Sequence, residues 1–334
     1  MTERTELLLA VDGGNSKTDL ALLRPDGTLV AAARGGTVSH QQVGPEAAGA
    51  RLRALVDQAA GAAGVLGEPV ASVAALCLAG MDLPADERTL RRVHGATGIA
   101  RTLVLENDTI AGLRAGSPEG WGVGVVVGEG INAVGIAPDG RRARFAGLGA
   151  ISGDRGGGAG LGMDALRVAV RAQDGRGPRT TLADLVPAHF GLRRPLDVTY
   201  ALYSGRLDDQ RISELARVVV HAARDGDAVA LGLLDDLADE CAAFATAAIR
   251  RLRLGRLAVP VVLSGGVARG AGDLLAKPVA GRVQEAAPGA EVRVLHDPPV
   301  VGAALLALDH APSAAPDAAD RVRSMLTHER LTQR

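Results

Sequence analysis

The sequence predicts a two-domain α/β protein, and three observations support this fold class. The chain has 334 residues, more than one ordinary hydrophobic core contains. Short apolar runs that end in glycine-rich turns alternate with longer segments whose apolar residues recur at helical spacing. The same succession of strands and turns also occurs twice along the chain. Together these features predict two domains of similar design.

The first half begins with three short strands and then alternates helix and strand. A Pro-Asp-Gly turn at residues 25–27 separates the second strand from the third. Apolar residues at helical spacing follow, beginning with Leu52, Leu55 and Val56. We therefore expect strands at residues 7–11, 18–23, 28–33, 73–78 and 102–105, and helices at residues 45–64, 87–94 and 109–115.

The pattern restarts near residue 123. A strand, a glycine-containing turn, a second strand, a Pro-Asp-Gly turn at residues 138–140 and a third strand follow one another as they do at the N-terminus. Chance would seldom place two such turns at the same point of matching strand triplets, so we interpret the repeat as a duplication. For the second half we expect strands at 123–127, 133–137, 141–145, 259–263 and 291–295, and helices at 161–172, 212–223, 228–254, 271–286 and 300–308.

These elements suggest an N-terminal domain at residues 1–113, a C-terminal domain at 114–312 and a tail at 313–334. From residue 311 the chain is rich in Ala, Pro and Asp, so we expect the tail to be loosely attached.

Composition excludes several classes of function. The net charge is −1 and aromatic residues make up 2%, which argues against nucleic acid or an anionic membrane as a partner. No apolar run is long enough for a transmembrane helix, and residues 1–6 are too polar for a secretory signal, so we expect a cytoplasmic location. Cys77 and Cys241 lie in apolar patterns and are expected to be buried thiols.

Three glycine-rich turns follow strands. They contain Asp12 to Thr18, Gly128 to Asn132 and Ser264 to Val267. Glycine permits positive φ and lets backbone N–H groups approach phosphate oxygens closely. One such turn alone would be read as an ordinary hairpin, but three at strand ends favour phosphate binding. None has the Walker A or Rossmann spacing, and Lys17 is the only lysine near these turns.

Two aspartates occupy positions suited to chemistry. Asp12 ends an apolar strand before two glycines, where a carboxylate suits Mg²⁺ beside nucleotide phosphates; the alternative is an aspartate that caps the turn. Asp108 follows a strand and precedes a helix. It is a candidate base for an attacking hydroxyl, and the alternative is a helix N-cap.

These motifs resemble those of a known family. The Asp12-Gly13-Gly14 hairpin, the Asn107-Asp108 pair, the repeated hairpin and the Ser264-Gly265-Gly266 turn are similar to those of the actin, sugar kinase and heat-shock ATPase superfamily. More narrowly, they resemble the BadF/BadG/BcrA/BcrD ATPase family, which contains N-acetylglucosamine kinase and glucosamine kinase. Residues 147–158, with Asp154 at the acidic position, and residues 299–308 resemble two further family segments. The resemblance implies two ribonuclease H-like domains of the actin-like ATPase fold with an interdomain cleft.

The resemblance also implies an activity: transfer of the γ-phosphoryl group of ATP to an amino sugar, most simply N-acetylglucosamine or glucosamine, with Mg²⁺. It implies Asp108 as the catalytic acid facing the acceptor and Asp12 as the metal residue. The implied ATP contacts are Asp12, Gly13, Gly14, Asn15, Lys17, Thr18, Gly128, Gly130, Gly265 and Gly266, and the implied sugar contacts are His40, Asn107, Asn132 and Asp154. A homodimer is left open.

Two residues depart from the family pattern. Glu129 stands in the second turn, where these kinases commonly carry a Thr-Gly-Ser type sequence, and a carboxylate is repelled by phosphates unless a cation intervenes. Arg155 replaces the usual Glu after Asp154, which suggests a different sugar pocket.

Two other functions remain as alternatives. One is an ATP-driven electron activator, which would need cysteines for an iron–sulfur cluster in glycine-rich interface loops. The other is a non-catalytic sugar sensor, which would usually carry a DNA-binding segment ahead of residue 7.

Overall fold

The computed structural model describes residues 6–65 and 68–332. The chain divides into two compact units. The first comprises Met1–Gly124 and Leu295–Arg334, and the second comprises Val125–Val294. This division differs from the boundaries expected at residues 113 and 312, because the last forty or so residues belong with the N-terminal part. Residues 1–5, on which the expectation about a secretory signal mostly rests, lie outside the described residues.

The first unit is built on a five-stranded mixed sheet in the order β3-β2-β1-β4-β5. The first three strands form an antiparallel meander, and β4 and β5 run parallel to β1. Their C-terminal ends therefore share one edge of the sheet. The strands are β1 (Leu8–Gly13), β2 (Lys17–Leu23), β3 (Leu29–Gly36), β4 (Ala71–Leu78) and β5 (Ala100–Asn107).

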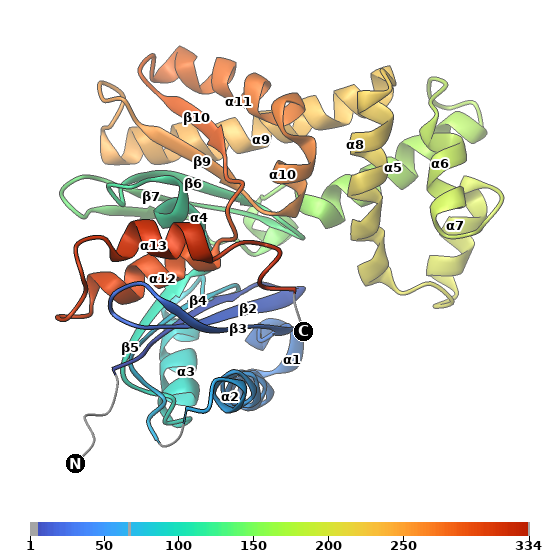
Figure 1. Ribbon diagram of the computed structural model, residues 1–334. Coiled ribbons are helices and arrows are strands. Elements are labelled where there is room, and N and C mark those ends of the chain that lie inside the picture. Colours follow the sequence, from blue (N-terminus) through green and yellow to red (C-terminus); the bar gives the residue numbers. More distant parts are fainter. Residues whose placement is uncertain (1–5, 66–67, 333–334) are drawn as a thin grey trace. The chain divides into compact units, whose positions relative to one another are not determined.

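Helices cover both faces of this sheet (Figure 1). On one face Val11, Leu20 and Leu76 form a buried core with Leu52 of α2 (Pro45–Ala62) and Leu90 of α3 (Pro84–Gly95). The other face carries α4 (Asp108–Gly116) and α12 (Val300–Asp309). These two helices touch through backbone. A Cβ atom on Gly302 would lie 1.9 Å from the carbonyl oxygen of Ala111, so only glycine fits at that crossing.

The sheet of the second unit repeats this design. Its order is β10-β9-β6-β7-β8, which is the order of the first sheet read from the opposite edge. The two Pro-Asp-Gly turns also match, since Gly27 and Gly140 both have φ of 84°. The predicted repeat is therefore confirmed. The strands are β6 (Gly122–Val127), β7 (Ile131–Ile136), β8 (Arg142–Arg144), β9 (Pro260–Ser264) and β10 (Glu291–Val294).

The second unit differs in what connects its strands. Between β3 and β4 the first unit has the one-turn helix α1 (His40–Val43) and α2. The corresponding connection between β8 and β9 holds a whole helical layer, of which the sequence did not predict α6 and α7. It consists of η1 (Gly149–Ser152), α5 (Gly157–Gln173), α6 (Leu182–His189), α7 (Pro195–Tyr203), η2 (Asp209–Glu214), α8 (Leu215–Arg224) and α9 (Ala228–Leu252). Two further helices, α10 (Gly266–Ala271) and α11 (Asp273–Ala286), follow β9.

The tail is not loosely attached, so that expectation was wrong. It forms α13 (Ala318–Met325), which packs on α12. The Arg323 guanidinium donates to the Ala115 carbonyl oxygen at 2.7 Å, and Arg321 pairs with Asp26 in the turn between β2 and β3. Leu326 is 1% exposed. The tail is thus a structural part of the first unit.

Two expectations from composition can be compared with the structure. Cys77 and Cys241 are both fully buried free thiols, as predicted. None of the helices within residues 6–65 and 68–332 combines the length and the apolar composition that a membrane-spanning helix requires.

Candidate functional site

The first glycine-rich turn connects β1 to β2 through Gly14, Asn15 and Ser16. The Gly14 N–H donates to the Lys17 carbonyl oxygen at 2.9 Å and closes the turn. Lys17, the first residue of β2, places its ammonium group 2.5 Å from Oδ2 of Asp19, which is fully buried. The sequence analysis did not single out Asp19, although its place two residues after Lys17 puts both side chains on one face of the strand.

Asp12 lies near the end of β1 in a crowded electrostatic environment. Its pKa is raised to about 8, mainly by burial and then by the neighbouring carboxylates of Asp108 and Asp19, whose effect exceeds the opposing effect of Lys17 and Arg34. Asp12 and Asp108, predicted from different parts of the sequence, are therefore brought within electrostatic reach of each other. A cation beside Asp12 would favour its ionised form.

Two other predicted residues of this turn have structural tasks. A Cβ atom on Gly13 would lie 2.8 Å from side-chain atoms of Leu78 and Val38, so this glycine permits close packing. Thr18 is fully buried and its hydroxyl donates to the Gly36 carbonyl oxygen at 2.9 Å, which ties β2 to β3. The predicted contact of Thr18 with ATP therefore finds no accessible side-chain atom. Gly13 and Gly14 also lack the positive φ that we expected of phosphate-binding glycines.

Asn107 and Asp108 lie at the start of α4 and have different roles there. The Asn107 side chain is the N-cap: its Oδ1 accepts from the Thr109 N–H at 3.0 Å and from the Thr109 hydroxyl at 2.6 Å. Its Nδ2 donates to Asp82 Oδ1 at 3.0 Å and to the Met81 carbonyl oxygen at 3.4 Å. Asn107 thus links α4 to the segment after β4, and the capping role considered for Asp108 is filled by its neighbour.

The carboxyl of Asp108 is poised close to neutral pH. Burial raises its pKa to about 6, while the N–H groups of Thr109 and Asp108 itself pull the value down. It lies at the helix N-terminus, where a negative charge is stabilised by the helix dipole. Such a group is ionised at pH 7 and is still a stronger base than an ordinary aspartate.

A second polar cluster surrounds His40. Its Nε2 lies 3.3 Å from Asp86 Oδ1, and Asp86 Oδ2 accepts from the Leu83 N–H at 2.8 Å. The other ring nitrogen, Nδ1, is buried and has no partner among the described residues, and the same holds for the hydroxyl of Ser39, which is 1% exposed. Two adjacent buried polar atoms without partners indicate that something else contacts them. The sequence analysis missed Ser39, because its burial is not visible in the sequence.

In the second unit, the turn Gly128-Glu129-Gly130 is held by backbone contacts. The Gly158 and Ala159 N–H groups at the start of α5 donate to the carbonyl oxygens of Gly128 and Glu129 at 2.8 and 2.9 Å. Gly157 has φ of 67°, and a Cβ atom there would lie 2.5 Å from the carbonyl carbon of Gly130. Glu129 therefore sits in a turn whose shape is set by neighbouring glycines.

The third turn touches the second. Gly265 has φ of 98°, and a Cβ atom there would lie 2.5 Å from the Val127 carbonyl oxygen. Of the six predicted ATP-binding glycines, Gly265 alone has the positive φ that only glycine adopts readily. Gly265 is the one residue between β9 and α10, which begins at Gly266.

Asn132 and the loop that contains Asp154 lie together. Gly147, at the start of the loop, has φ of 62°, and a Cβ atom there would lie 2.3 Å from Nδ2 of Asn132. Within the loop, Asp154 Oδ2 accepts from the Gly149 N–H at 3.0 Å and lies 2.6 Å from the Ser152 hydroxyl. Oδ1 of Asp154 makes no hydrogen bond to the part of the chain that the structure describes.

Arg155, the second departure from the family pattern, turns towards α9. Its guanidinium pairs with Asp236 at 3.0 Å, and the backbone N–H of Arg155 donates to Glu240 Oε1 at 3.2 Å. Both members of the Arg155–Asp236 pair are at least half exposed, so the pair is weak and replaceable.

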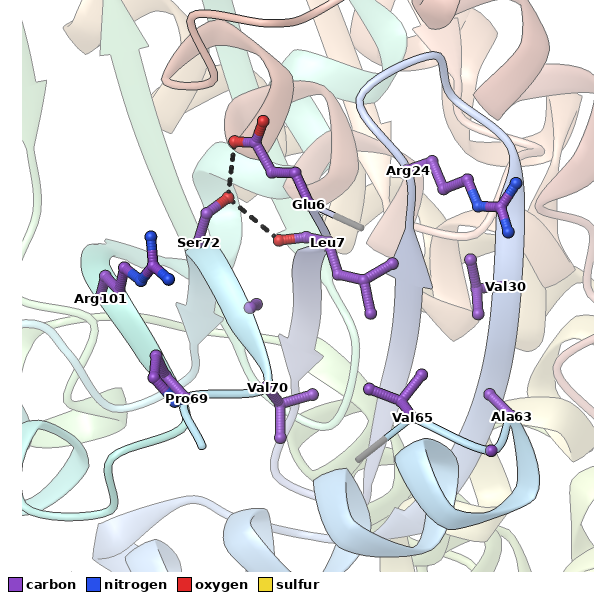
Figure 2. Close-up of a pocket in the computed structure, with 12 residues that line it drawn as sticks. Glu6, Leu7, Arg24, Val30, Ala63, Val65, Pro69, Val70, Ser72 and Arg101 are labelled. Carbon is purple, nitrogen blue, oxygen red and sulfur yellow. Dashed lines mark hydrogen bonds between the residues drawn. The ribbon is translucent and has the colours of Figure 1, made fainter. Parts of the chain in front are cut away.

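A cavity of about 650 Å³ in the first unit is a separate feature (Figure 2). It lies at the N-terminal ends of β1 and β4, whereas Asp12 and Asp108 follow C-terminal strand ends. Its polar wall includes Glu6, which accepts from the Ser72 hydroxyl at 2.9 Å, and its lining also includes Arg24 and Arg101. This cavity is therefore not part of the candidate site. The described residues also contain no group of three or more acidic, histidine or cysteine side chains that would form a metal cage.

The two sheets of like order, with glycine-containing turns after their first strands, define a protein of the actin-like ATPase fold. More narrowly, the chain belongs to the BadF/BadG/BcrA/BcrD ATPase family, whose model matches residues 9–307.

Curated relatives span most of the chain. An N-acetyl-D-glucosamine kinase of Dictyostelium discoideum is 26% identical over 317 residues, which cover 91% of this chain and 98% of the relative. An N-acetylmuramic acid/N-acetylglucosamine kinase of Clostridium acetobutylicum is 27% identical over 262 residues, or 78% and 85% of the two chains. A crystal structure from Chromobacterium violaceum, designated an N-acetylglucosamine kinase, is 26% identical with a TM-score of 0.71 and covers 92% of this chain and 100% of its own.

Proposed function

We propose that this protein is an ATP-dependent carbohydrate kinase that transfers the γ-phosphoryl group of ATP to a hydroxyl of an amino sugar. N-acetylglucosamine and glucosamine are the first candidates. The observation that carries the proposal is the carboxyl of Asp108, whose pKa of about 6 suits a general base. The names of the three relatives, which are all designated kinases of N-acetylglucosamine, support the acceptor class.

Asp108 would act on the acceptor hydroxyl. As the hydroxyl oxygen attacks the γ-phosphorus, its proton passes to the carboxylate. The new O–P bond forms while the bond between the γ-phosphorus and the β-phosphate oxygen breaks, and ADP leaves with the electron pair. The Asn107 cap fixes the start of α4, so Asn107 would act by positioning Asp108. Both N–H groups of its side-chain amide already donate to Met81 and Asp82, which leaves no amide donor for the predicted contact with the sugar.

Four polar side chains are the proposed sugar contacts. In the first unit these are the Ser39 hydroxyl and His40 Nδ1, because both are buried and a sugar hydroxyl can donate to one and accept from the other. In the second unit they are Asn132 and Oδ1 of Asp154. Hydrogen bonds from buried polar groups discriminate strongly against acceptors that lack the matching hydroxyl.

The nucleotide contacts would come from the three turns. Lys17 supplies charge, the backbone of residues 128–130 supplies N–H groups, and Gly265 and Gly266 would lie against the adenosine.

Mg²⁺ fits the residues of the first turn. Burial and the carboxylates of Asp108 and Asp19 raise the pKa of Asp12 despite Lys17 and Arg34, so a further cation would stabilise its ionised form, and Asn15 Oδ1 is a buried oxygen without a partner in the described chain. Oxygen ligands of this kind suit Mg²⁺, which is usually held by one or two carboxylates together with water and phosphate. When bound, the ion neutralises phosphate charge. Asp12 and Asn15 would hold it.

A phosphoryl-transfer assay with a panel of acceptors tests the proposal. With ATP and Mg²⁺, we expect N-acetylglucosamine or glucosamine to be phosphorylated with a kcat/KM well above that of glucose, and glycerol to be inactive. The panel should include N-acetylmuramic acid, because Arg155 is held only weakly by Asp236 and could meet a carboxylate. If no sugar is a better acceptor than glycerol, the proposal fails, and sugar binding without transfer would favour the sensor function.

The Asp154→Ala variant tests the sugar contacts. We expect a rise in the sugar KM of about 10-fold or more with little change in the ATP KM, since a lost hydrogen bond of a charged group costs about 1.5–3 kcal/mol. Asp164→Ala, which removes an ion pair with Arg167 within α5, is a matched control. An unchanged sugar KM would reduce Asp154 to a residue that only shapes its loop.

Because ATP is the phosphoryl donor, we also propose that the enzyme acts in the cytoplasm, and we leave a homodimer to be tested by light scattering.

A further inference from the structure

A row of side chains crosses the sheet of the first unit at the level of Asp12. Asp12 lies directly opposite Asp19 on β2, and Asp19 lies opposite Arg34 on β3. Side chains of directly opposed residues project from the same face of a sheet. Their neighbours Val11 and Leu20 belong to the core under α2 and α3, so the row lies on the other face.

Asp19 is the centre of this row. Its side chain is fully buried, and it accepts from Arg34 through both oxygens: Nε lies 2.5 Å from Oδ1 and Nη2 lies 3.0 Å from Oδ2. Lys17 contacts the same Oδ2. A buried carboxylate needs such partners, and the two-pronged contact fixes the plane of the guanidinium as a single contact would not.

Arg34 keeps binding capacity after this contact. Its Nη1 has no hydrogen-bond partner within the described residues, and its side chain is 28% exposed. Asp12 is one of the groups that raise the pKa of Arg34, after Asp19, so the guanidinium lies within electrostatic reach of Asp12. A fixed cation with unused donors therefore lies one strand beyond Asp19 and within electrostatic reach of Asp12, the residue that we assign to the metal side of ATP.

We propose that Arg34 is a second phosphate-binding cation, which contacts the terminal phosphates of ATP through Nη1 while Asp19 holds it in place. The inference rests on the proposed function and extends its nucleotide site. The physical reason is charge: Asp19 and Asp108, together with Asp12 when a cation favours its ionised form, place negative charge where the polyphosphate adds more, and Lys17 alone offsets little of it. A planar guanidinium that is already oriented loses little entropy on binding phosphate.

The competing explanation is that Arg34 only neutralises Asp19. A double-mutant cycle separates the two, because Asp19→Asn removes the charge that Arg34 would neutralise. If Arg34 contacts phosphate, Arg34→Gln weakens nucleotide binding by a similar factor with Asp19 or Asn at position 19. If Arg34 acts only through Asp19, Arg34→Gln has no further effect in the Asp19→Asn background.

The measurement is calorimetric binding of a non-hydrolysable ATP analogue with Mg²⁺, and of AMP, to the full-length protein. For Arg34→Gln we expect about 10- to 100-fold weaker binding of the ATP analogue and a change in AMP affinity below about threefold. Arg24→Gln, an exposed arginine at the far end of the same hairpin, is the matched control and should bind both like the wild type.

Each outcome decides the matter. An ATP-analogue affinity that Arg34→Gln leaves unchanged, or that is restored in the double variant, overturns the proposal, and so does an equal loss of AMP affinity. If Arg34→Gln does not fold, Asp19→Asn compared with the double variant gives the same answer. Because no sugar is present, a failure of amino-sugar phosphorylation would sink the proposed function without affecting this result.

Discussion

The first hairpin of each unit occupies the same place in its sheet, but the two hairpins are held by different groups. The turn after β1 is surrounded by charged side chains, namely Asp12, Lys17 and Asp19. The turn after β6 is held by Gly157 and Gly265, which allow backbone to pack on backbone. Among the described residues the buried polar and charged residues follow the same division: the first unit contains Thr18, Asp19, Ser39, His94, Asn107, Thr109 and Ser117, and the second contains Ser264.

This difference shows how a duplicated fold diverges. The strand order and the Pro-Asp-Gly turns are retained because they form the sheet. The residues at the strand ends are free to change. The turn of the first unit is surrounded by titratable side chains, whereas the turn of the second unit is packed by glycines. We therefore expect substitutions in the first unit to act on chemistry and charge, and those in the second to act on the path of the backbone.

Asp108→Asn should have the largest effect. Asparagine keeps the shape but cannot take a proton, so we expect kcat to fall about 10²- to 10⁴-fold with nucleotide affinity within a few-fold of the wild type. Steady-state kinetics and calorimetry on the same sample measure both. Asp309→Asn, which breaks an ion pair with Arg114 elsewhere in this unit, is the control. A variant that keeps more than about a tenth of kcat would remove Asp108 from the chemistry.

Gly157→Ala tests the second half and should have the next largest effect. The new Cβ would meet the backbone of Gly130 at a positive φ, so we expect a loss of about 2 to 5 kcal/mol in the free energy of unfolding of the second unit, together with weaker ATP binding. Gly160→Ala, where no atom lies within 4 Å of the added Cβ, is the matched control. Urea unfolding decides, and equal midpoints for the two variants would contradict the backbone explanation.

His94→Leu tests whether the burial of a titratable side chain in the first unit lowers the free energy of unfolding at acidic pH. Both ring nitrogens are buried without partners in the described chain, and burial, followed by the nearby His40, lowers the pKa of His94 from 6.5 to about 4. The folded state therefore disfavours the charged form. The stability linked to His94 is complete above pH 6.5 and is lost as the pH falls towards 4.

We expect the wild type to lose about 1 to 2 kcal/mol more than His94→Leu between pH 7.5 and pH 5. Urea unfolding at the two pH values measures this difference, and His310→Leu on the surface is the control. Parallel losses in wild type and variant would show that His94 does not titrate in this way.

Glu129→Gln should have the smallest effect. If the second turn works through its backbone, removal of this charge should change the affinity for the ATP analogue by no more than about threefold. Glu119→Gln is the matched control. A gain of tenfold or more in calorimetry would mean that the carboxylate repels phosphate directly, and that side chains matter in the second turn as they do in the first.

The strands of both sheets and the repeat were predictable, because buried strands appear in the sequence as apolar runs and the turns between them contain characteristic residues such as Pro-Asp-Gly. The helix α13 was not, since its segment is poor in apolar periodicity and its stability comes from contacts with residues far away in sequence, such as Asp26 and Ala115. The helices α6 and α7 were missed because they are short and α6 contains Pro187.

For the site, position at strand ends was enough to find Asp12 and Asp108. It did not reveal which neighbours were already occupied. Thr18 and Asn107 are polar residues in candidate motifs, yet the side chains of both form hydrogen bonds within the fold. Ser39 becomes a candidate only when its burial and its lack of a partner in the described chain are known. Hydrogen-bond partners are set by tertiary structure, which a single sequence does not display.

The return of the chain to the first unit after β10 sets an order of folding during synthesis. Residues 125–294 are contiguous and can close their sheet as soon as they leave the ribosome. The N-terminal strands emerge earlier but wait for α12, whose Gly302 packs directly on Ala111, and for α13. Domains usually mature in the order of their synthesis. Here the part made first is completed last, and a nascent chain stalled before residue 300 would carry an uncovered sheet face beside a finished second unit.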